Sequence, residues 1–434
     1  MGNLPFLTLP DPKATGEGAL DPLGLSVIGD RLAERILPGL RARMSRPRFL
    51  TAIAVCAAVC EGMEDEIAKD GVTPAYLVFE WLLVEAFVRC ADRGVTRGTP
   101  GIQKAQAAKT ENEVMCARTY LRVPSVFGFH GVYKPLAIHL GIIRDDLQLD
   151  DNGYALLEIW QDEQRLPGFL QSSVIGGAGK SMRESIRLAV QDSMRAGHSK
   201  RSAGWNGWQL LADHLTPATF GKREADFARG LLTRDTAEPR GEVFRLLKPV
   251  RGDLAESDVA RTALLPRAST LLGERIRAVD AFETLGTLLE DAFDIVRYLS
   301  TMAGARAITS QDFEEEVLSR RLSKGLPRAL LRAEEVLLEE SPELQRTFGE
   351  LARVFQRVAN PLELFDAVLM RHNEVQKAKP PDGKRDWFER TPSGAAFVRT
   401  QYRLTEPVER TEHWNRPYRI DSARSFLADF AAAR

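Results

Sequence analysis

The chain has 434 residues, of which 44% are hydrophobic and 27% are charged. This composition is typical of a water-soluble globular protein, and the length is enough for two or three hydrophobic cores. Lys and Arg together number 59 and Asp and Glu number 60, so the formal net charge is −1. A chain this close to neutrality has no overall basic footprint, so any nucleic-acid contact has to rest on a local cluster of cations.

Cysteine and histidine usage gives no sign of a metal site. The four cysteines, Cys56, Cys60, Cys90 and Cys116, lie in apolar sequence and form no CxxC pair. We therefore expect small buried hydrophobic side chains. The six histidines are widely scattered, so we expect no structural zinc and no cofactor.

We expect no targeting or membrane segment. Residues 1–6 lack the basic start and apolar core of a signal peptide, and the longest apolar run, 49–60, is too short to cross a bilayer. We expect a cytoplasmic protein with no membrane contact.

The first third of the chain alternates between helical patterns and turns. Residues 1–20 are rich in Pro and Gly and predict an extended arm. Helical spacing of apolar residues then predicts helices over 25–37, 47–66, 73–89, 111–121 and 132–143. Alternation of Leu147 and Leu149 before an Asp-Asp-Asn-Gly turn predicts a two-strand hairpin over 147–157.

The remainder is almost entirely helical in pattern. Helices are predicted over 177–195, 206–214, 222–232, 239–247, 257–265, 272–300, 327–358, 361–377 and 422–433, with a capping start at 310–313. A short strand pair is predicted across the turn 391–394. We predict a mainly α, multi-helix protein with an embedded winged-helix-like module and a small C-terminal β-hairpin. The expected segments are 1–105, 106–165, 166–380 and 381–434.

Residues 111–160 give the first candidate site. Their predicted order of helix, turn, helix and hairpin resembles the end of a winged-helix domain. In that arrangement 132–140 is the recognition helix, with Lys134, His139 and Arg144 as its exposed polar groups and 150–153 as the wing tip. Four aspartates near the tip would repel phosphate, so a packing or protein-contact role stays open.

The Gly-rich segment 172–181 gives the second candidate site. Gly176-Gly177-Ala178-Gly179-Lys180-Ser181 is similar to the end of a phosphate-binding P-loop. The glycine that such a loop needs five residues before Gly-Lys-Ser is Val174 here, so the alternative is a loop that caps a helix.

The segment 371–388 gives the third and most informative candidate site. A helix runs into Pro380-Pro381-Asp382-Gly383, and the cations Lys379, Lys384 and Arg385 gather around this turn with Trp387. We predict an anion or nucleic-acid contact in which Trp387 serves as a stacking platform. Cations at a helix C-terminus also compensate its dipole, which is the structural alternative.

An enzymatic alternative uses the same segment. His372 would carry protons beside Lys379 and Lys384, as in a nuclease or a phosphate-processing hydrolase. No set of acidic residues or activated nucleophile accompanies them, so we favour a non-catalytic role.

Two stretches carry a family resemblance. Residues 21–25 through 37–40 with 46–50, and residues 372–388 with Tyr402-Arg403 and Tyr418-Arg419, together resemble a loosely defined set of uncharacterised helical bacterial proteins encoded near restriction and anti-phage defence genes. The resemblance implies a subunit of a multi-protein defence system. The prediction is therefore a nucleic-acid- or partner-binding subunit, with DNA, RNA or other subunits as partners. A purely structural scaffold is the further alternative.

Overall fold

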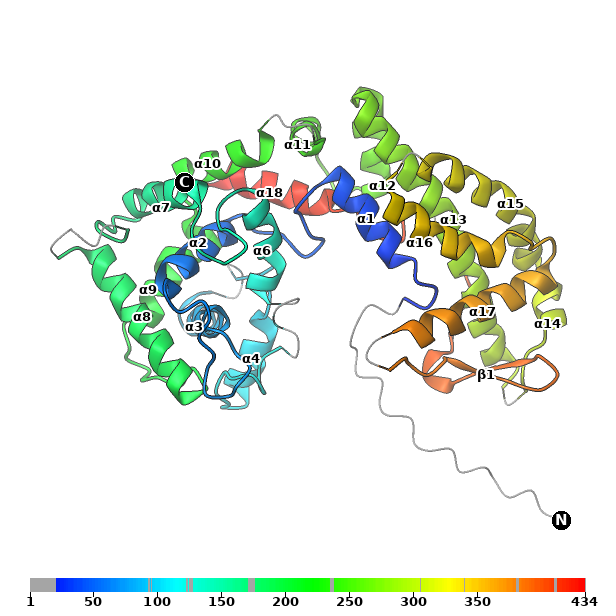
Figure 1. Cartoon of the computed structure of the whole chain (residues 1–434), viewed down its shortest axis with the longest axis horizontal. Helices are drawn as coiled ribbons and strands as arrows, with labels where there is room; N and C mark the ends of the chain where they lie inside the picture. Colours follow the sequence, from blue (N-terminus) through cyan, green and yellow to red (C-terminus); the bar gives the residue numbers. More distant parts are fainter. Residues whose placement is uncertain are drawn as a thin grey trace, which may run out of the picture. The chain divides into compact units, whose positions relative to one another are not determined.

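The computed structural model describes residues 21–433 except 93, 95, 122–123, 125–127, 171–175, 235–237, 305, 339, 380–381 and 410–411. The predicted arm over 1–20 lies outside the described residues. The described part is mainly helical with one small antiparallel sheet, which confirms the predicted fold class (Figure 1). Its helices contain no segment long and apolar enough to cross a membrane.

The chain divides into two compact units. Unit 1 contains Leu32 and the described residues before it together with Gly273–Arg416, and unit 2 contains Ala33–Leu272 and Pro417–Arg434. Each unit is therefore built from two separate stretches of sequence. The four consecutive segments expected from the sequence stay predictions, because they divide the chain along its length and not by packing.

Unit 2 is a helical assembly around two apolar helices. Its elements are α2 (Arg48–Cys60), α3 (Ala75–Cys90), α4 (Ile102–Thr110), α6 (Phe129–His139), α7 (Asp151–Glu163), α8 (Ala178–Ala196), α9 (Gly207–Leu215), α10 (Lys222–Thr233), α11 (Arg240–Leu247), α12 (Glu256–Val259) and α18 (Ile420–Ala432). Short 3-10 turns at Pro217–Thr219 and Leu265–Arg267 and a π turn at Ala260–Leu264 complete it. Helix α2 packs on α3, α6, α7, α8 and α9, which explains its apolar sequence.

One buried ion pair lies in this core. Arg48 of α2 pairs with Glu224 of α10, and both side chains are fully buried. The Arg48 guanidinium also donates to the carbonyl of His214, and the Thr51 hydroxyl donates to the second Glu224 oxygen. A buried charge is tolerated only when it is paired and hydrogen-bonded, so this network fixes α2, α9 and α10 together.

Unit 1 combines five helices with the hairpin. Its elements are most of α13 (Thr270–Met302), α14 (Ser310–Glu315), α15 (Val317–Leu337), α16 (Pro342–Phe355), α17 (Pro361–Ala378), β1 (Phe388–Arg390), β2 (Ala396–Val398) and the 3-10 turn Thr400–Tyr402. Helix α1 (Ser26–Ile36) begins in unit 1 and ends in unit 2. Helix α17 contacts α14, α15 and α16, and the hairpin lies beside it (Figure 1).

The predicted C-terminal hairpin is confirmed. Strands β1 and β2 pair antiparallel, with Phe388 opposite Val398 and Arg390 opposite Ala396. Ile308 adds an isolated bridge to Ala396 on the other side of β2.

Two predicted helices were wrong. Residues 111–121 form turns, and the helix of this region is α4 over Ile102–Thr110, which Gly101 precedes in a left-handed conformation (φ 80°). Asn112, with φ 54°, ends it. The single helix predicted over 327–358 is interrupted, because the Ser341 side chain caps α16 and Pro342 occupies its first position.

Candidate functional site

The first predicted cluster lies on unit 2, and two of its three side chains contact carboxylates of the same unit. Helix α6 carries Lys134, which is half-buried, and His139, whose Nε2 lies 3.0 Å from a carboxylate oxygen of Glu238. Arg144 follows the helix and pairs with Asp146 at 3.3 Å. These contacts occupy two of the three groups proposed to meet phosphate.

The wing predicted beside this cluster is not observed. Ile143 and Leu149 make a single antiparallel bridge, and the sheet of the described residues contains only β1 and β2. Asp150 caps α7, its side chain accepting from the backbone N–H of Asp151, so the expected wing tip over 150–153 is a helix start. The Asp-Asp-Asn-Gly sequence is compatible with a helix cap as well as with a hairpin turn, and in the structure it caps α7.

The Gly-rich segment has a packing explanation. Residues 171–175 lie outside the described residues, whereas 176–181 lead into α8. A Cβ on Gly177 would lie 2.2 Å from the carbonyl oxygen of Pro167, and one on Gly179 would lie 2.2 Å from that of Leu166. The N–H of Gly179 donates to the Pro167 carbonyl at 3.1 Å. These glycines therefore allow two backbone segments to approach each other closely.

The third cluster surrounds the C-terminal end of α17 on unit 1. Gly383, with φ 84°, turns the chain so that its N–H donates to Lys379 O at 2.7 Å and the next N–H, of Lys384, donates to Gln376 O at 2.8 Å. These bonds satisfy helix-end carbonyls. Pro380 and Pro381, which the sequence places in this turn, lie outside the described residues.

His372 does not have the exposure that a proton carrier needs. Its side chain is 0% exposed, Nδ1 lies 3.0 Å from the carbonyl of Pro22, and Nε2 accepts from the N–H of Trp387 at 3.1 Å. The ring stacks on Phe293 with centroids 4.9 Å apart. Burial lowers the pKa of His372 to about 4. This geometry describes a neutral structural histidine, and it gives the enzymatic alternative no general acid or base.

The proposed stacking platform is also occupied. Trp387 is buried, and the ring of Tyr402 stacks parallel to it with centroids 4.5 Å apart. Lys379 is half-buried and donates to the carbonyl of Asp21 at 3.0 Å. Burial lowers the pKa of Lys379. Of the predicted contact residues here, Lys384 and Arg385 are exposed, and Arg385 pairs with Glu389 at 3.3 Å.

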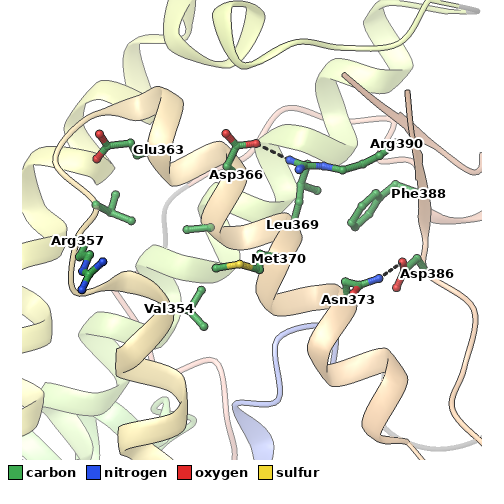
Figure 2. Close-up of a pocket in the computed structure, with 12 residues that line it drawn as sticks. Val354, Arg357, Glu363, Asp366, Leu369, Met370, Asn373, Asp386, Phe388 and Arg390 are labelled. Atoms are coloured by element: carbon green, nitrogen blue, oxygen red, sulfur yellow. Dashed lines mark hydrogen bonds and ion pairs between the residues drawn. The ribbon is translucent and has the colours of Figure 1, made fainter. Parts of the chain in front are cut away.

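A groove that no sequence pattern predicted lies beside this cluster. It has a volume of about 660 Å³ and runs along α17, whose residues form its centre (Figure 2). One wall is formed by Val354, Arg357 and Val358, the floor by Glu363, Asp366, Ala367, Leu369, Met370 and Asn373, and the other wall by Asp386, Phe388 and Arg390.

Two polar bridges fix β1 and the residues just before it against α17 at the far wall. Arg390 pairs with Asp366 at 2.5 Å, and the amide of Asn373 donates to Asp386 at 2.5 Å. Asp366 and Asn373 are seven residues apart, so they lie on one helix face with Met370 between them. Figure 2 shows both bridges, with Met370 lying between them on α17.

Between the two bridges the groove floor consists of the apolar side chains of Ala367, Leu369 and Met370, of which Met370 is exposed. Met370 is 47% exposed, whereas its neighbours Leu369 and Phe388 are buried. An exposed, flexible thioether on an apolar floor with charged residues at its rim is a common feature of surfaces that bind other proteins. The sequence signal was Met370 itself, which lies outside the buried stripe of α17, but the walls could not be assigned without the tertiary structure.

The predicted residues are divided between the two units. Lys134, His139 and Arg144 belong to unit 2, and the third cluster belongs to unit 1. No group of three or more His, Cys, Asp or Glu side chains in the described part of the chain has the spacing of a metal site. Cys56 and Cys60 are buried as predicted, Cys116 is half-buried, and Cys90 is exposed, contrary to the prediction.

Comparison of the chain with models of known protein families, with curated proteins and with solved structures finds no match.

Proposed function

We propose that this protein is a non-catalytic binding subunit whose groove on α17 receives a segment of a protein partner. The observation that carries the proposal is the exposed Met370, set in an apolar floor between the two polar bridges. Apolar anchors surrounded by polar rims supply most of the free energy of protein association. If the resemblance predicted from the sequence holds, such a partner would be another subunit of a bacterial defence system.

The test is co-purification with the products of neighbouring genes. Met370→Glu puts a charge on the groove floor at a solvent-exposed helix position, so the chain keeps its fold while the groove loses its apolar character. Leu331→Glu is the matched control, because Leu331 is 57% exposed on α15 and does not line the groove. The proposal expects a complex that Met370→Glu disrupts and Leu331→Glu preserves. A complex indifferent to both changes would contradict it.

Nucleic-acid binding is the second candidate. It is favoured by Lys384 and Arg385, which are both exposed beside the C-terminal end of α17. Phosphate contacts of this kind weaken steeply as salt is raised. Titration of duplex and single-stranded DNA and RNA, at several salt concentrations, compares the wild type with Lys384→Glu/Arg385→Glu. Binding that is independent of salt and of these changes removes this candidate.

A further inference from the structure

Strand β1 is the open edge of its sheet. Ala396 exchanges two hydrogen bonds of 2.8 Å with Ile308, so its backbone groups point away from β1. Ala396 lies opposite Arg390, which makes this a pair without hydrogen bonds between the strands. The N–H and C=O of Arg390 therefore also point away from β2, and those of Phe388, two residues earlier, point the same way.

These four backbone groups have no hydrogen-bond partner among the residues that the structure describes. The neighbouring backbone groups do, because Trp387 O accepts from Arg399 N–H and Thr391 N–H donates to Ala395 O, each at 2.9 Å. Unpaired N–H and C=O groups along a strand edge are a template for a further strand.

The open backbone and the groove belong to the same two residues. Phe388 and Arg390 line the groove wall with their side chains. A strand that pairs with β1 would direct alternate side chains to the same face of the sheet as these two, toward Met370. On the opposite wall, Arg357 is exposed and makes no ion pair within the described ranges, so it offers a cation to an acidic side chain.

We propose that the groove binds an extended segment of a partner protein, which pairs with β1 as an added strand. Its apolar side chains occupy every second position and contact Met370 and Phe388, and an acidic side chain reaches Arg357. A helix offers no free backbone groups along its length and would leave the edge unpaired, so the observations favour an extended segment. This inference rests on the proposed function of the groove.

The probe is a phage-displayed library of random dodecapeptides, selected on the full-length protein. The strongest peptides are synthesised, and their affinities for the wild type, Met370→Glu and Leu331→Glu are compared. We expect apolar residues at alternating positions of the selected peptides. Affinity should fall at least about tenfold with Met370→Glu and stay unchanged with Leu331→Glu, because the loss of one buried apolar anchor typically weakens binding by this much.

N-methylation of the peptide backbone tests for an added strand directly. Each N–H that faces β1 donates a hydrogen bond, whereas the intervening N–H groups face solvent. We expect methylation at every second residue to weaken binding by about fivefold or more, and methylation between these positions to have little effect.

A matched pair of protein variants tests the other side of the interface. Arg390→Pro removes the open N–H but no bond between β1 and β2, because that N–H points outward. Arg390→Ala removes the same ion pair with Asp366 and keeps the N–H. We expect Arg390→Pro to bind the peptides about fivefold more weakly than Arg390→Ala, with the same melting temperature within a few degrees.

The outcomes separate the two proposals. Peptides that depend on Met370 but show no alternation on N-methylation, and bind Arg390→Pro and Arg390→Ala equally, would overturn strand addition and leave the groove as the site. A selection that yields no peptide dependent on Met370 would overturn both.

Discussion

His372 provides a sharp test of the structure of unit 1, because its environment predicts a pH-dependent contribution to stability. The folded state holds the ring neutral, since burial lowers its pKa to about 4. In the unfolded chain the ring titrates near its ordinary value of about 6.5. Between these two values the unfolded state binds the proton and the folded state does not. Falling pH therefore favours unfolding throughout this window.

The perturbation is His372→Gln, which removes the titrating ring. At pH 7.5 we expect the variant to lose about 2–4 kcal/mol of unfolding free energy, because the stack on Phe293 disappears and the N–H of Trp387 loses a well-placed acceptor. At pH 5.0 the wild type has itself lost about 2 kcal/mol of unfolding free energy. This pH is roughly 1.5 units below the pKa of the unfolded state, and each unit costs about 1.4 kcal/mol. The penalty of the variant should shrink by that amount.

The assay is denaturant unfolding of the full chain at both pH values, followed by tryptophan fluorescence and circular dichroism. The difference between variant and wild type isolates His372, because the other titrating groups are common to both proteins. A penalty that is equal at pH 5.0 and 7.5, or no penalty at all, would refute the buried, neutral histidine.

Three further changes test unit 2. Burial raises the pKa of Glu80 to about 7, so the folded state loses stability as pH rises from about 4.5 through 7. The stability of Glu80→Gln relative to the wild type should therefore rise by about 3 kcal/mol between pH 4.5 and 8, as measured by denaturant unfolding. A stability difference that stays constant over this range would contradict this. Arg48→Met leaves Glu224 buried without its cation and should lower the free energy of unfolding by about 3–5 kcal/mol. The double change Arg48→Met/Glu224→Leu should recover much of this stability in the same unfolding measurement. Gly179→Ala should lower the melting temperature by several degrees, because a Cβ there meets a carbonyl oxygen at 2.2 Å, and Gly230→Ala, with open space, should not.

Local sequence signals predicted the elements better than their partners. Helical periodicity found most helices, and the turn at 391–394 with its flanking apolar residues predicted the hairpin that the structure contains. The helix over 111–121 was wrong because capping residues and a left-handed Asn112 decide where a helix of moderate propensity ends. The wing failed for a related reason, since an Asp side chain can cap a helix as readily as it can begin a turn.

The candidate site depends on tertiary contacts that no local sequence pattern contains. A proton carrier at His372 and a stacking platform at Trp387 would both need exposed rings, yet both rings are buried. Their partners Pro22 and Tyr402 come from segments that are distant in sequence or folded back on them. The groove is lined by α17 and by two segments that pack against it, 354–358 and 386–390. Only the exposed Met370 could be noticed from periodicity, and its neighbours in space could not.

The most direct measurement of the central claim is the affinity between the full-length protein and a partner obtained by co-purification, determined by isothermal titration calorimetry. Wild type, Met370→Glu and Leu331→Glu are compared under the same conditions. The groove as partner site predicts that Met370→Glu weakens binding by at least about tenfold and that Leu331→Glu leaves it unchanged. Equal affinity of all three proteins would contradict it.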